Sequence, residues 1–446
     1  MLTRYLSYRT VAIRTTLLAL LFALAGCASE HYFVNRPLDT DSFQPRYAVR
    51  NLATEDNSDS LLIVLSFSGG GYRAAAFSYG VLETLASTPI HWEGKDKRLL
   101  DEVDFITGVS GGSLTAAYYT LNRDQTFTNF ESQVLGADLQ SKVQWRLLSP
   151  RGLWRQTSRR FGRADMLQEV LNEQVFHDKT YGDLPMSRPM LLINATEMKL
   201  GERFEFSQDQ FDLLCSDLSS FPLARAVAAS MAVPIVLSPI TLWNHTEDCP
   251  WHGAPLPLKS RVGSRSYVHL LDGGLSDNTG VKTPLEIVEA RGGIIGTARA
   301  ANMHGIRKRV FIVVNAQTAP DLPEDDNPNT PGLYRQLRAL INIPIDLHSS
   351  VSVEQLRAAT KRWQEELKQA SRAEVGDTYA VDSSFYVIEI NLGAAKAHTK
   401  LPDLQGIETS LSISPEQIAA LKAFARNELQ ASPEWQRLMN DLARGR

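Results

Sequence analysis

The sequence has no excess of basic residues. Lys and Arg number 46 against 50 Asp and Glu, which gives a formal net charge of −4. A general nucleic-acid binder usually carries more cations than anions, because it must neutralise phosphates. The charge balance therefore argues against nucleic acid as a partner.

The apolar run near the start is too short to span a bilayer comfortably, which takes about 20 apolar residues. It covers residues 17–25, and Arg4, Arg9 and Arg14 precede it without any acidic residue. A positive leader followed by a short apolar stretch is typical of a secretory signal peptide. We therefore expect residues 1–26 to be a leader that does not join the fold.

This apolar run ends in Leu-Ala-Gly-Cys at residues 24–27, which resembles a bacterial lipobox. In that family of signals the cysteine is lipidated and becomes the mature N-terminus, so Cys27 would anchor the chain to a membrane. Ala28 and Ser29 follow with no Asp, which by the same resemblance favours the outer membrane of a bacterial cell envelope. An ordinary signal peptide with a chance cysteine is the alternative.

The sequence shows no metal-binding motif, and we expect neither a metal nor a cofactor. Cys215 and Cys249 are the two cysteines beyond Cys27. An even pair in an oxidising compartment suggests a disulfide. The alternative is a metal site built from His245, Cys249 and His252, although that set is short of the usual four ligands.

Short apolar, β-prone runs alternate with helical patterns along the chain. Buried strands are predicted at 61–67, 103–107, 189–194, 309–314 and 385–390. Such alternation indicates an α/β fold, in which a mainly parallel central sheet is covered by helices on both faces. We expect a tether, a catalytic core and a C-terminal extension packing on that core, at 27–60, 61–315 and 316–446.

Two helices are predicted in the C-terminal extension. A charged amphipathic helix is expected at 351–373, after a surface loop at 319–332 rich in Pro, Asp and Asn. The last helix has Ser414 as its N-cap, with Pro415 in its first turn and Gln417 completing a capping box.

One serine lies within a cluster of glycines. Residues 108–112 read Gly-Val-Ser-Gly-Gly, a G-x-S-x-G pattern between a predicted strand and a helix. A nucleophilic serine needs a sharp turn to project its hydroxyl, and flanking glycines tolerate that backbone. The pattern is weak by itself, but its context favours Ser110 as a nucleophile, with Gly108, Gly111 and Gly112 shaping the elbow.

A second glycine run also lies between a strand and a helix. Residues 69–73 read Gly-Gly-Gly-Tyr-Arg. They do not form a Walker-type phosphate loop, because no Lys-Ser/Thr follows, and Ala74 occupies the last glycine of a dinucleotide fingerprint. Consecutive glycines can present several backbone N–H groups to an oxyanion, which is the favoured interpretation.

A third element is Asp272, which ends an apolar strand and precedes Gly273 and Gly274. An acid in this position can reach the turn of a neighbouring strand. The alternative is an Asp-Gly β-turn, which is common.

Together these elements resemble the patatin-like phospholipase family. A fourth match is Ala-Ser-Met-Ala-Val-Pro at residues 229–234, and the order and approximate spacing of all four agree with the family. The resemblance covers about residues 61–315. It departs at Ala74, where many members have Gly. It implies the patatin-like three-layer α/β fold.

The resemblance also implies a serine acyl hydrolase that cleaves fatty-acyl esters of lipids or phospholipids without a cofactor. Ser110 would be the nucleophile and Asp272 the general base of a Ser–Asp dyad. A dry pocket would have to raise the basicity of Asp272, because free Asp has a pKa near 4. The oxyanion hole would be formed by Gly69, Gly70, Gly71, Tyr72 and Arg73.

Acyl transfer to an acceptor other than water is chemically close to this hydrolysis, and the sequence does not separate the two. Three further alternatives stay open. One is a Ser–Asp–His triad in chain order, using His304, His348 or His398. Another is a catalytically silent lipoprotein of the same fold that binds lipid or a partner, although such a protein needs neither the serine nor the acid. The third concerns Arg73, which could bind a substrate phosphate instead of supporting its loop.

A basic and aromatic insertion is expected at 140–165. Its cations are interleaved with Trp145, Trp154 and Phe161, which sets it apart in an acidic protein. It is either a lid or interfacial patch that meets lipid head groups, or an ordinary exposed insertion. The cations are Lys142, Arg146, Arg151, Arg155, Arg159, Arg160 and Arg163.

Overall fold

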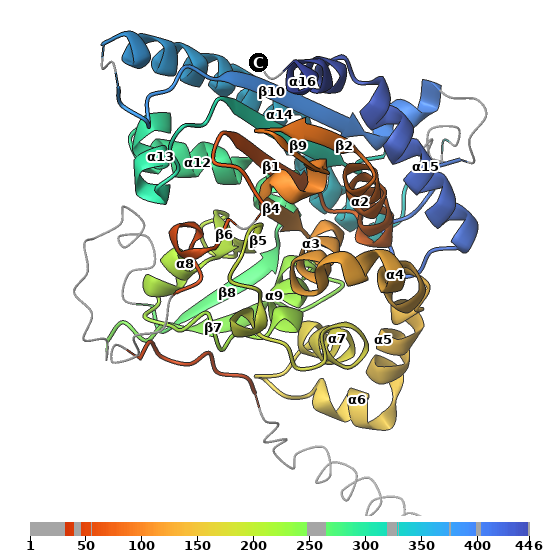
Figure 1. Ribbon diagram of the computed structural model, residues 1–446. Coiled ribbons are helices and arrows are strands. Elements are labelled where there is room, and N and C mark those ends of the chain that lie inside the picture. Colours follow the sequence, from red (N-terminus) through yellow and green to blue (C-terminus); the bar gives the residue numbers. More distant parts are fainter. Residues whose placement is uncertain are drawn as a thin grey trace, which may run out of the picture.

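A computed structural model describes most of the chain (Figure 1). The described residues are 32–39, 46–54, 56–247, 265–318, 328, 330–373, 376–397 and 403–444. The expected leader, the lipidated Cys27 and one half of the expected disulfide, Cys249, lie outside these residues. Among the described residues, no helix combines the length and the apolar character that crossing a membrane requires.

The centre of the molecule is an eight-stranded mixed sheet. Its order is β10-β9-β1-β4-β5-β8-β7, with β6 paired to β5. The first five strands in this order run parallel, whereas β6, β7 and β8 are antiparallel to their neighbours. The strands are β1 Leu61–Phe67, β4 Val103–Val109, β5 Met190–Glu197, β6 Arg203–Phe206, β7 Ile240–Trp243, β8 Tyr267–Asp272, β9 Lys308–Asn315 and β10 Ser384–Asn391.

Strand β9 shows why the sheet is covered on both faces. All eight of its residues are buried, as expected for a central strand in a parallel sheet. Val310, Ile312 and Val314 join one apolar cluster, whereas Phe311 and Val313 join another. Because successive side chains point to opposite faces, the two clusters are the cores on either side of the sheet.

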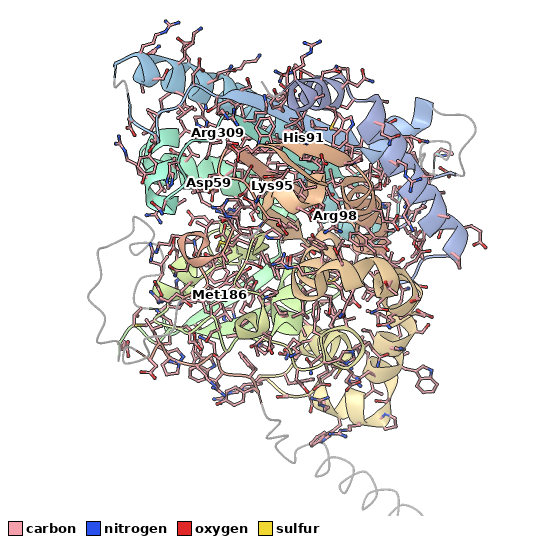
Figure 2. The ribbon with its side chains drawn as sticks, viewed as in Figure 1. Asp59, His91, Lys95, Arg98, Met186 and Arg309 are labelled. Carbon is pink, nitrogen blue, oxygen red and sulfur yellow. The ribbon has the colours of Figure 1, made fainter. Side chains whose placement is uncertain are left out.

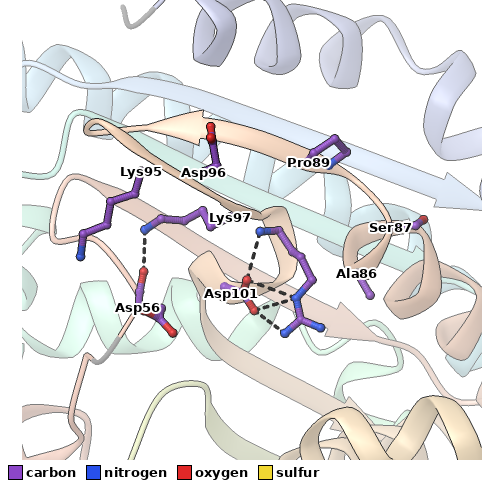
Figure 3. Close-up of a pocket in the computed structure, with 9 residues that line it drawn as sticks. Asp56, Ala86, Ser87, Pro89, Lys95, Asp96, Lys97 and Asp101 are labelled. Carbon is purple, nitrogen blue, oxygen red and sulfur yellow. Dashed lines mark hydrogen bonds and ion pairs between the residues drawn. The ribbon is translucent and has the colours of Figure 1, made fainter.

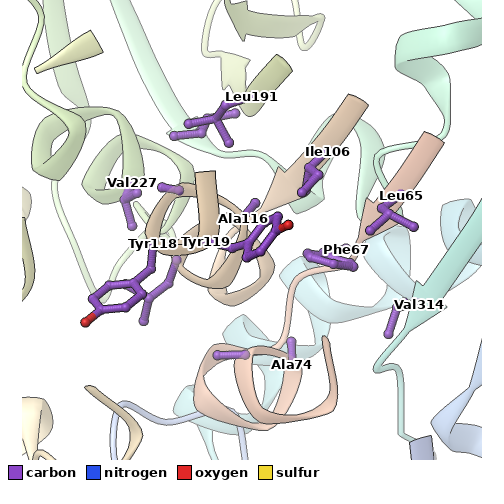
Figure 4. Packing of buried hydrophobic residues seen from close by; sticks show 14 of the residues in the cluster. Leu65, Phe67, Ala74, Ile106, Ala116, Tyr118, Tyr119, Leu191, Val227 and Val314 are labelled. Atoms are coloured by element: carbon purple, nitrogen blue, oxygen red, sulfur yellow. The ribbon is translucent and has the colours of Figure 1, made fainter. Parts of the chain in front are cut away.

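The larger core lies against helices from distant parts of the chain. Figure 4 shows Leu65, Phe67 and Ile106 of the sheet packed beside Ala74 and Ala116 of two helices. Ala74 belongs to α2 Gly71–Ala86 and Ala116 to α3 Gly111–Asn122. Three further helices complete this layer: α9 Leu223–Ser230, α15 Pro415–Ala431 and α16 Pro433–Ala443.

The smaller core lies under helices on the opposite face, including Val353 and Leu356 of the longest helix. These helices are α12 Lys282–Ala290, α13 Ile294–Ala301 and α14 Leu333–Ala373. The predicted three-layer arrangement with a mainly parallel sheet is therefore confirmed.

The C-terminal part contributes to both the sheet and a helical layer. Strand β10 pairs with β9 along its whole length, and α15 begins with the predicted capping box between Ser414 and Gln417. The predicted helix at 351–373 is wrong at its start, because α14 begins at Leu333 and continues through Pro344. The helix thus accommodates Pro344, although a proline removes one backbone donor from a helix interior.

The described parts of the expected tether pack on the domain. Tyr47 is buried, and its hydroxyl accepts a hydrogen bond from the Leu191 amide at 2.8 Å. Leu38 N donates to Cys215 O at 2.8 Å, and Leu52 is also buried. This differs from the free tether expected, since isolated apolar residues without periodicity gave no sign of a packed segment.

Strand β9 also carries a charge into the smaller core. Arg309, labelled in Figure 2, is almost fully buried. Its guanidinium donates to the Ser383 hydroxyl and lies 5.6 Å from the centre of the Phe385 ring. Burial lowers the pKa of Arg309 to about 10, because the charged form loses hydration.

Candidate active site

Ser110 lies at the turn from β4 into α3. Its φ of 49° and ψ of −122° place it outside the regions that ordinary residues prefer. A Cβ on Gly111 would collide with the carbonyl oxygen of Gly71, and one on Gly112 would lie 2.5 Å from Ser68 O. Strand β4 thus meets α3 in a tight, strained elbow that only glycines after the serine permit.

The Ser230 hydroxyl, at the end of α9, supports this elbow by a hydrogen bond. The Ser110 amide donates to Ser230 Oγ at 2.7 Å, and Ser230 Oγ donates to Asn194 O on β5 at 2.6 Å. The carbonyl of Ser230 also accepts from Gly273 N at 3.1 Å. Ser230 therefore holds the backbone of the serine turn and that of the aspartate turn in place together. Its own hydroxyl is occupied by the hydrogen bonds to Ser110 and Asn194.

Replacing Ser230 with alanine should lower kcat while leaving KM nearly unchanged. The buried Ser110 amide would lose its acceptor, at a cost of about 1–3 kcal/mol, and the elbow would shift. We expect kcat to fall by about 10- to 100-fold in an ester hydrolysis assay. The matched control is Ser78→Ala, since the buried Ser78 hydroxyl has no hydrogen-bond partner among the described residues. Equal effects of the two substitutions on kcat would refute a positioning role.

Asp272 ends β8 beside β5, where it pairs with Ala195. Its Oδ1 accepts a hydrogen bond from Gly274 N at 2.8 Å, and its Oδ2 is buried without a hydrogen-bond partner among the described residues. Burial raises the pKa of Asp272 to about 6, against the opposing influence of the Gly274 amide and the Ser110 hydroxyl. A carboxylate with such a pKa is a far better base than a free Asp.

Ser110 and Asp272 therefore meet across the sheet. The hydroxyl of Ser110 lies near enough to lower the pKa of the carboxyl, although Oδ2 has no partner in hydrogen-bond geometry. Catalytic hydrogen bonds in free enzymes are often long and close only with substrate bound. The arrangement leaves one buried carboxylate oxygen available beside the hydroxyl.

The glycine run lies directly against this pair. A Cβ on Gly69 would be 3.3 Å from Ser110 Cβ and 2.5 Å from Asn278 Oδ1. Gly70 and Gly71 have φ values of 135° and 57°, which favour glycine. The loop can therefore approach the serine closely only because its residues lack side chains.

The amides of the five expected oxyanion residues have different partners. Gly69 N donates to Asn278 O at 3.0 Å, and Tyr72 N donates to Ser410 O at 2.8 Å. Within the described part of the chain, the N–H groups of Gly70 and Gly71 have no acceptor, and neither has that of Gly111 in the first turn of α3. These three amides are therefore available to an oxyanion, which adds Gly111 to the candidates named from the sequence.

Arg73 supports the loop from behind. Its Nε donates to Ala316 O at 3.0 Å, and its Nη1 donates to Ile407 O. The side chain is buried. Arg73 thus ties the start of α2 to the end of β9 and to the C-terminal segment, which favours support over phosphate binding.

Comparison with known protein families gives a match over the part of the chain that holds the candidate site. Residues 65–285 match the family model described as patatin-like phospholipase. This match covers just under half of the chain. The fold is the patatin-like fold, and the matched residues include all four motifs of the sequence.

Comparison with solved structures finds matches at low identity. The chain is similar to human GIVD cytosolic phospholipase A2, with 12% identity and a TM-score of 0.45, over 87% of this chain and 61% of that one. It is also similar to VipD from Legionella pneumophila, with 13% identity and a TM-score of 0.34, over 90% and 72% of the two chains. The chain thus spans about three fifths of the human enzyme's length. Comparison with curated proteins gives no match.

Two residues of the patatin-like site were missed from the sequence. Asn278 accepts from Gly69 through its carbonyl, and its Nδ2 donates to Ser349 Oγ on α14 at 3.0 Å. Ser410 accepts from Tyr72. Asn278 follows Asp272 within the same short run, which was a usable signal, whereas nothing near Ser410 pointed to the site.

The histidines expected for a triad do not bind Asp272 in the described part of the chain. His304 packs edge-on against the ring of Tyr379, while His398 and the side chain of His348 lie outside the described residues. Asp272 Oδ1 is bound by Gly274, and Oδ2 has no described partner. Of the three candidates, His304 is therefore not the third member of a triad, and the Ser–Asp dyad stays a prediction.

The alternative metal site also gains no support. His245 Nε2 lies 2.8 Å from Asn35 O, and His252 lies outside the described residues, as Cys249 does. No group of three His, Cys, Asp or Glu side chains suited to a metal occurs within the described ranges. Cys215 is disulfide-bonded, and its pairing with Cys249 stays a prediction.

A separate pocket of about 510 Å³ lies away from the dyad (Figure 3). Its walls include the hairpin of β2 Pro89–Trp92 and β3 Lys95–Arg98. The charges there are paired locally, because Arg98 bonds Asp101 at 2.6 Å and Lys97 bonds Asp56 O at 2.5 Å. We therefore do not assign the active site to this pocket.

Proposed function

We propose that this chain is a serine acyl hydrolase that cleaves fatty-acyl ester bonds of lipids, including phospholipids, through Ser110 and Asp272. The observation that carries the proposal is the meeting of a strained serine with a buried carboxylate whose pKa is raised to about 6. Gly69 lies against the same serine, and the amides of the next two glycines, Gly70 and Gly71, have no acceptor among the described residues. The patatin-like phospholipase domain supports lipid as the substrate class.

In the proposed reaction, Ser110 Oγ attacks the ester carbonyl while its proton passes to Asp272 Oδ2. The carbonyl oxygen becomes an oxyanion, which the amides of Gly70, Gly71 and Gly111 stabilise; one such donor typically lowers the barrier by about 3–4 kcal/mol. The intermediate then expels the alcohol, which takes the proton from Asp272. An acyl-enzyme ester remains on Ser110.

Water releases the acyl group in a second half-reaction. Asp272 accepts a proton from the water as it attacks the acyl-enzyme, and Ser110 Oγ leaves with that proton. The products are a free fatty acid and the regenerated serine. Because Oδ2 has no fixed partner among the described residues, it can serve both half-reactions.

Product analysis in ¹⁸O-water tests this function. Phospholipid vesicles incubated with the protein should release fatty acid carrying one ¹⁸O atom, with the matching lysophospholipid as the second product. Ser110→Ala should release neither. Fatty acid without ¹⁸O would contradict hydrolysis by water, and binding of vesicles without any product would favour the catalytically silent lipid-binding alternative.

We also propose that Cys27 carries a lipid anchor in the outer membrane of a bacterial envelope. The support is the Leu-Ala-Gly-Cys sequence after a short apolar run, followed by Ala28 and Ser29. The mature chain should begin at a modified Cys27, visible in the intact mass, and fractionate with outer membranes. Cys27→Ala should abolish the added mass. An unmodified mature chain would contradict the anchor.

A further inference from the structure

Two consecutive helices present large apolar side chains to the surface. On α5 Leu139–Leu148, Trp145 is 77% exposed and Leu148 is 71% exposed. On α6 Pro150–Arg155, Leu153 is 55% exposed and Trp154 is 38% exposed. A single exposed apolar residue is ordinary, but a group of them marks a surface that meets a partner or a membrane.

The charged side chains of these two helices, and of the loop that follows them, are all cations. Residues 139–164 contain no acidic residue. Arg146 and Arg155 are neutralised by Glu169 on the next helix, at 3.1 Å and 2.6 Å. Arg151 and Arg159 are exposed and form no ion pair with described residues. The surface therefore combines apolar side chains with free cations, which suits anionic lipid head groups.

The start of the described chain lies on the same side of the molecule. The guanidinium of Arg160, just beyond α6, lies 4.6 Å from the centre of the Tyr32 ring. Figure 1 shows the first described residues running along the lower side of the view, where α6 lies. Cys27 precedes Tyr32 by five residues, and such a segment reaches at most about 18 Å. A lipid on Cys27 would hold this side against the bilayer.

This surface also connects with the active site. Arg163, at the start of α7 Arg163–Leu171, donates to Ile235 O at 2.7 Å. Ile235 and Val236 are exposed and follow closely on Ser230, which braces the nucleophile. A bilayer in contact with α5 and α6 would thus lie next to the segment that follows Ser230, whose hydroxyl binds the amide of Ser110.

We propose that α5 and α6 form a docking surface for a lipid bilayer. Trp145, Leu148, Leu153 and Trp154 enter the head-group region, and Arg151 and Arg159 bind lipid phosphates. Trp is the side chain that most favours this depth, since its ring is apolar with one polar edge. This docking surface rests on the proposed function and on the proposed lipid anchor at Cys27. It adds to that function the orientation in which the anchored enzyme meets its lipid substrate.

Depth-dependent quenching of tryptophan fluorescence tests the docking surface directly. The full lipidated chain with Ser110→Ala, which leaves the vesicles intact, is reconstituted into phosphatidylethanolamine and phosphatidylglycerol vesicles with brominated acyl chains. Bromine near the head groups should quench the fluorescence. Trp145→Phe with Trp154→Phe should remove most of the quenching, whereas Trp435→Phe, at a buried residue of α16, should leave it unchanged.

Activity on two substrates separates docking from folding. Trp145→Ser with Leu148→Ser should slow vesicle hydrolysis by about tenfold, because partition follows buried apolar area, and should leave a soluble ester unaffected. The matched control is Met198→Ser with Leu200→Ser, also exposed but on the turn between β5 and β6. An equal loss of vesicle hydrolysis in both double variants would overturn the proposal that α5 and α6 dock on the bilayer.

Other outcomes are also decisive. Absence of quenching from a chain whose intact mass shows the lipid on Cys27 would overturn the docking surface. Self-association lost in Trp145→Ser would mean that a second copy covers the helices. Quenching together with no hydrolysis of any ester would contradict the proposed function while leaving the docking surface in place.

Discussion

Replacing Ser110 with alanine should lower kcat for ester hydrolysis by about 10⁴-fold or more, because no covalent intermediate can form. KM should change little, since the hydroxyl contributes little to ground-state binding. The assay is steady-state hydrolysis of a soluble ester. Ser87→Ala, at the end of α2, is the matched control and should retain full activity. Residual activity of Ser110→Ala above a few per cent would rule this serine out as nucleophile.

Asp272→Asn should abolish activity at every pH, whereas the native enzyme should lose activity only in acid. Because burial raises the pKa of Asp272 to about 6, kcat/KM should fall about tenfold per pH unit below that value as the base becomes protonated. The measurement is a pH profile of kcat/KM from pH 4.5 to 8.5. An acid limb near pH 4, or an active Asp272→Asn, would show that another group is the base.

The same substitution should stabilise the fold at neutral pH. The pKa of Asp272 is higher in the folded chain than its ordinary value of 3.8, so the folded state holds this proton more tightly than the unfolded state. Its contribution to stability is therefore complete below about pH 3.8 and is lost as the pH rises through about 6. Because an Asn side chain does not ionise, Asp272→Asn avoids this loss of stability at high pH.

Thermal unfolding of both proteins at pH 4 and pH 8 shows whether Asp272→Asn raises or lowers the free energy of unfolding. Each unit of pKa shift corresponds to 1.36 kcal/mol, so Asp272→Asn should gain about 1–3 kcal/mol at pH 8 and little at pH 4. The Gly274 amide keeps an acceptor in the Asn side chain. A loss of stability at pH 8 would show that the carboxylate is better compensated than its burial indicates.

The elements recognised from the sequence were those with a local cause. Glycines flanking Ser110 are required by a turn that leaves no room for a Cβ, and Gly70 and Gly71 by positive φ. Continuous apolar runs such as β9 exist because both faces of the sheet are covered. Each of these causes acts within a few residues, so it is visible in the sequence.

The parts that were missed depend on tertiary contacts. Ser410 matters only as a carbonyl that accepts from Tyr72, and any residue type could supply it. The predicted helix missed the first part of α14, Leu333 to Ser350, which includes Pro344. The insertion at 140–165 looked strongly basic, but Glu169 on α7 neutralises Arg146 and Arg155. Partners distant in sequence cannot be inferred from local pattern.

The most direct test is labelling with a fluorophosphonate, which reacts with an activated serine and mimics the charged tetrahedral intermediate. The account predicts one label per chain, located by peptide mass spectrometry on Ser110, with labelling abolished in Asp272→Asn and slowed below pH 6. A label on any other serine, or unchanged labelling of Asp272→Asn, would contradict the pairing of this nucleophile with this base.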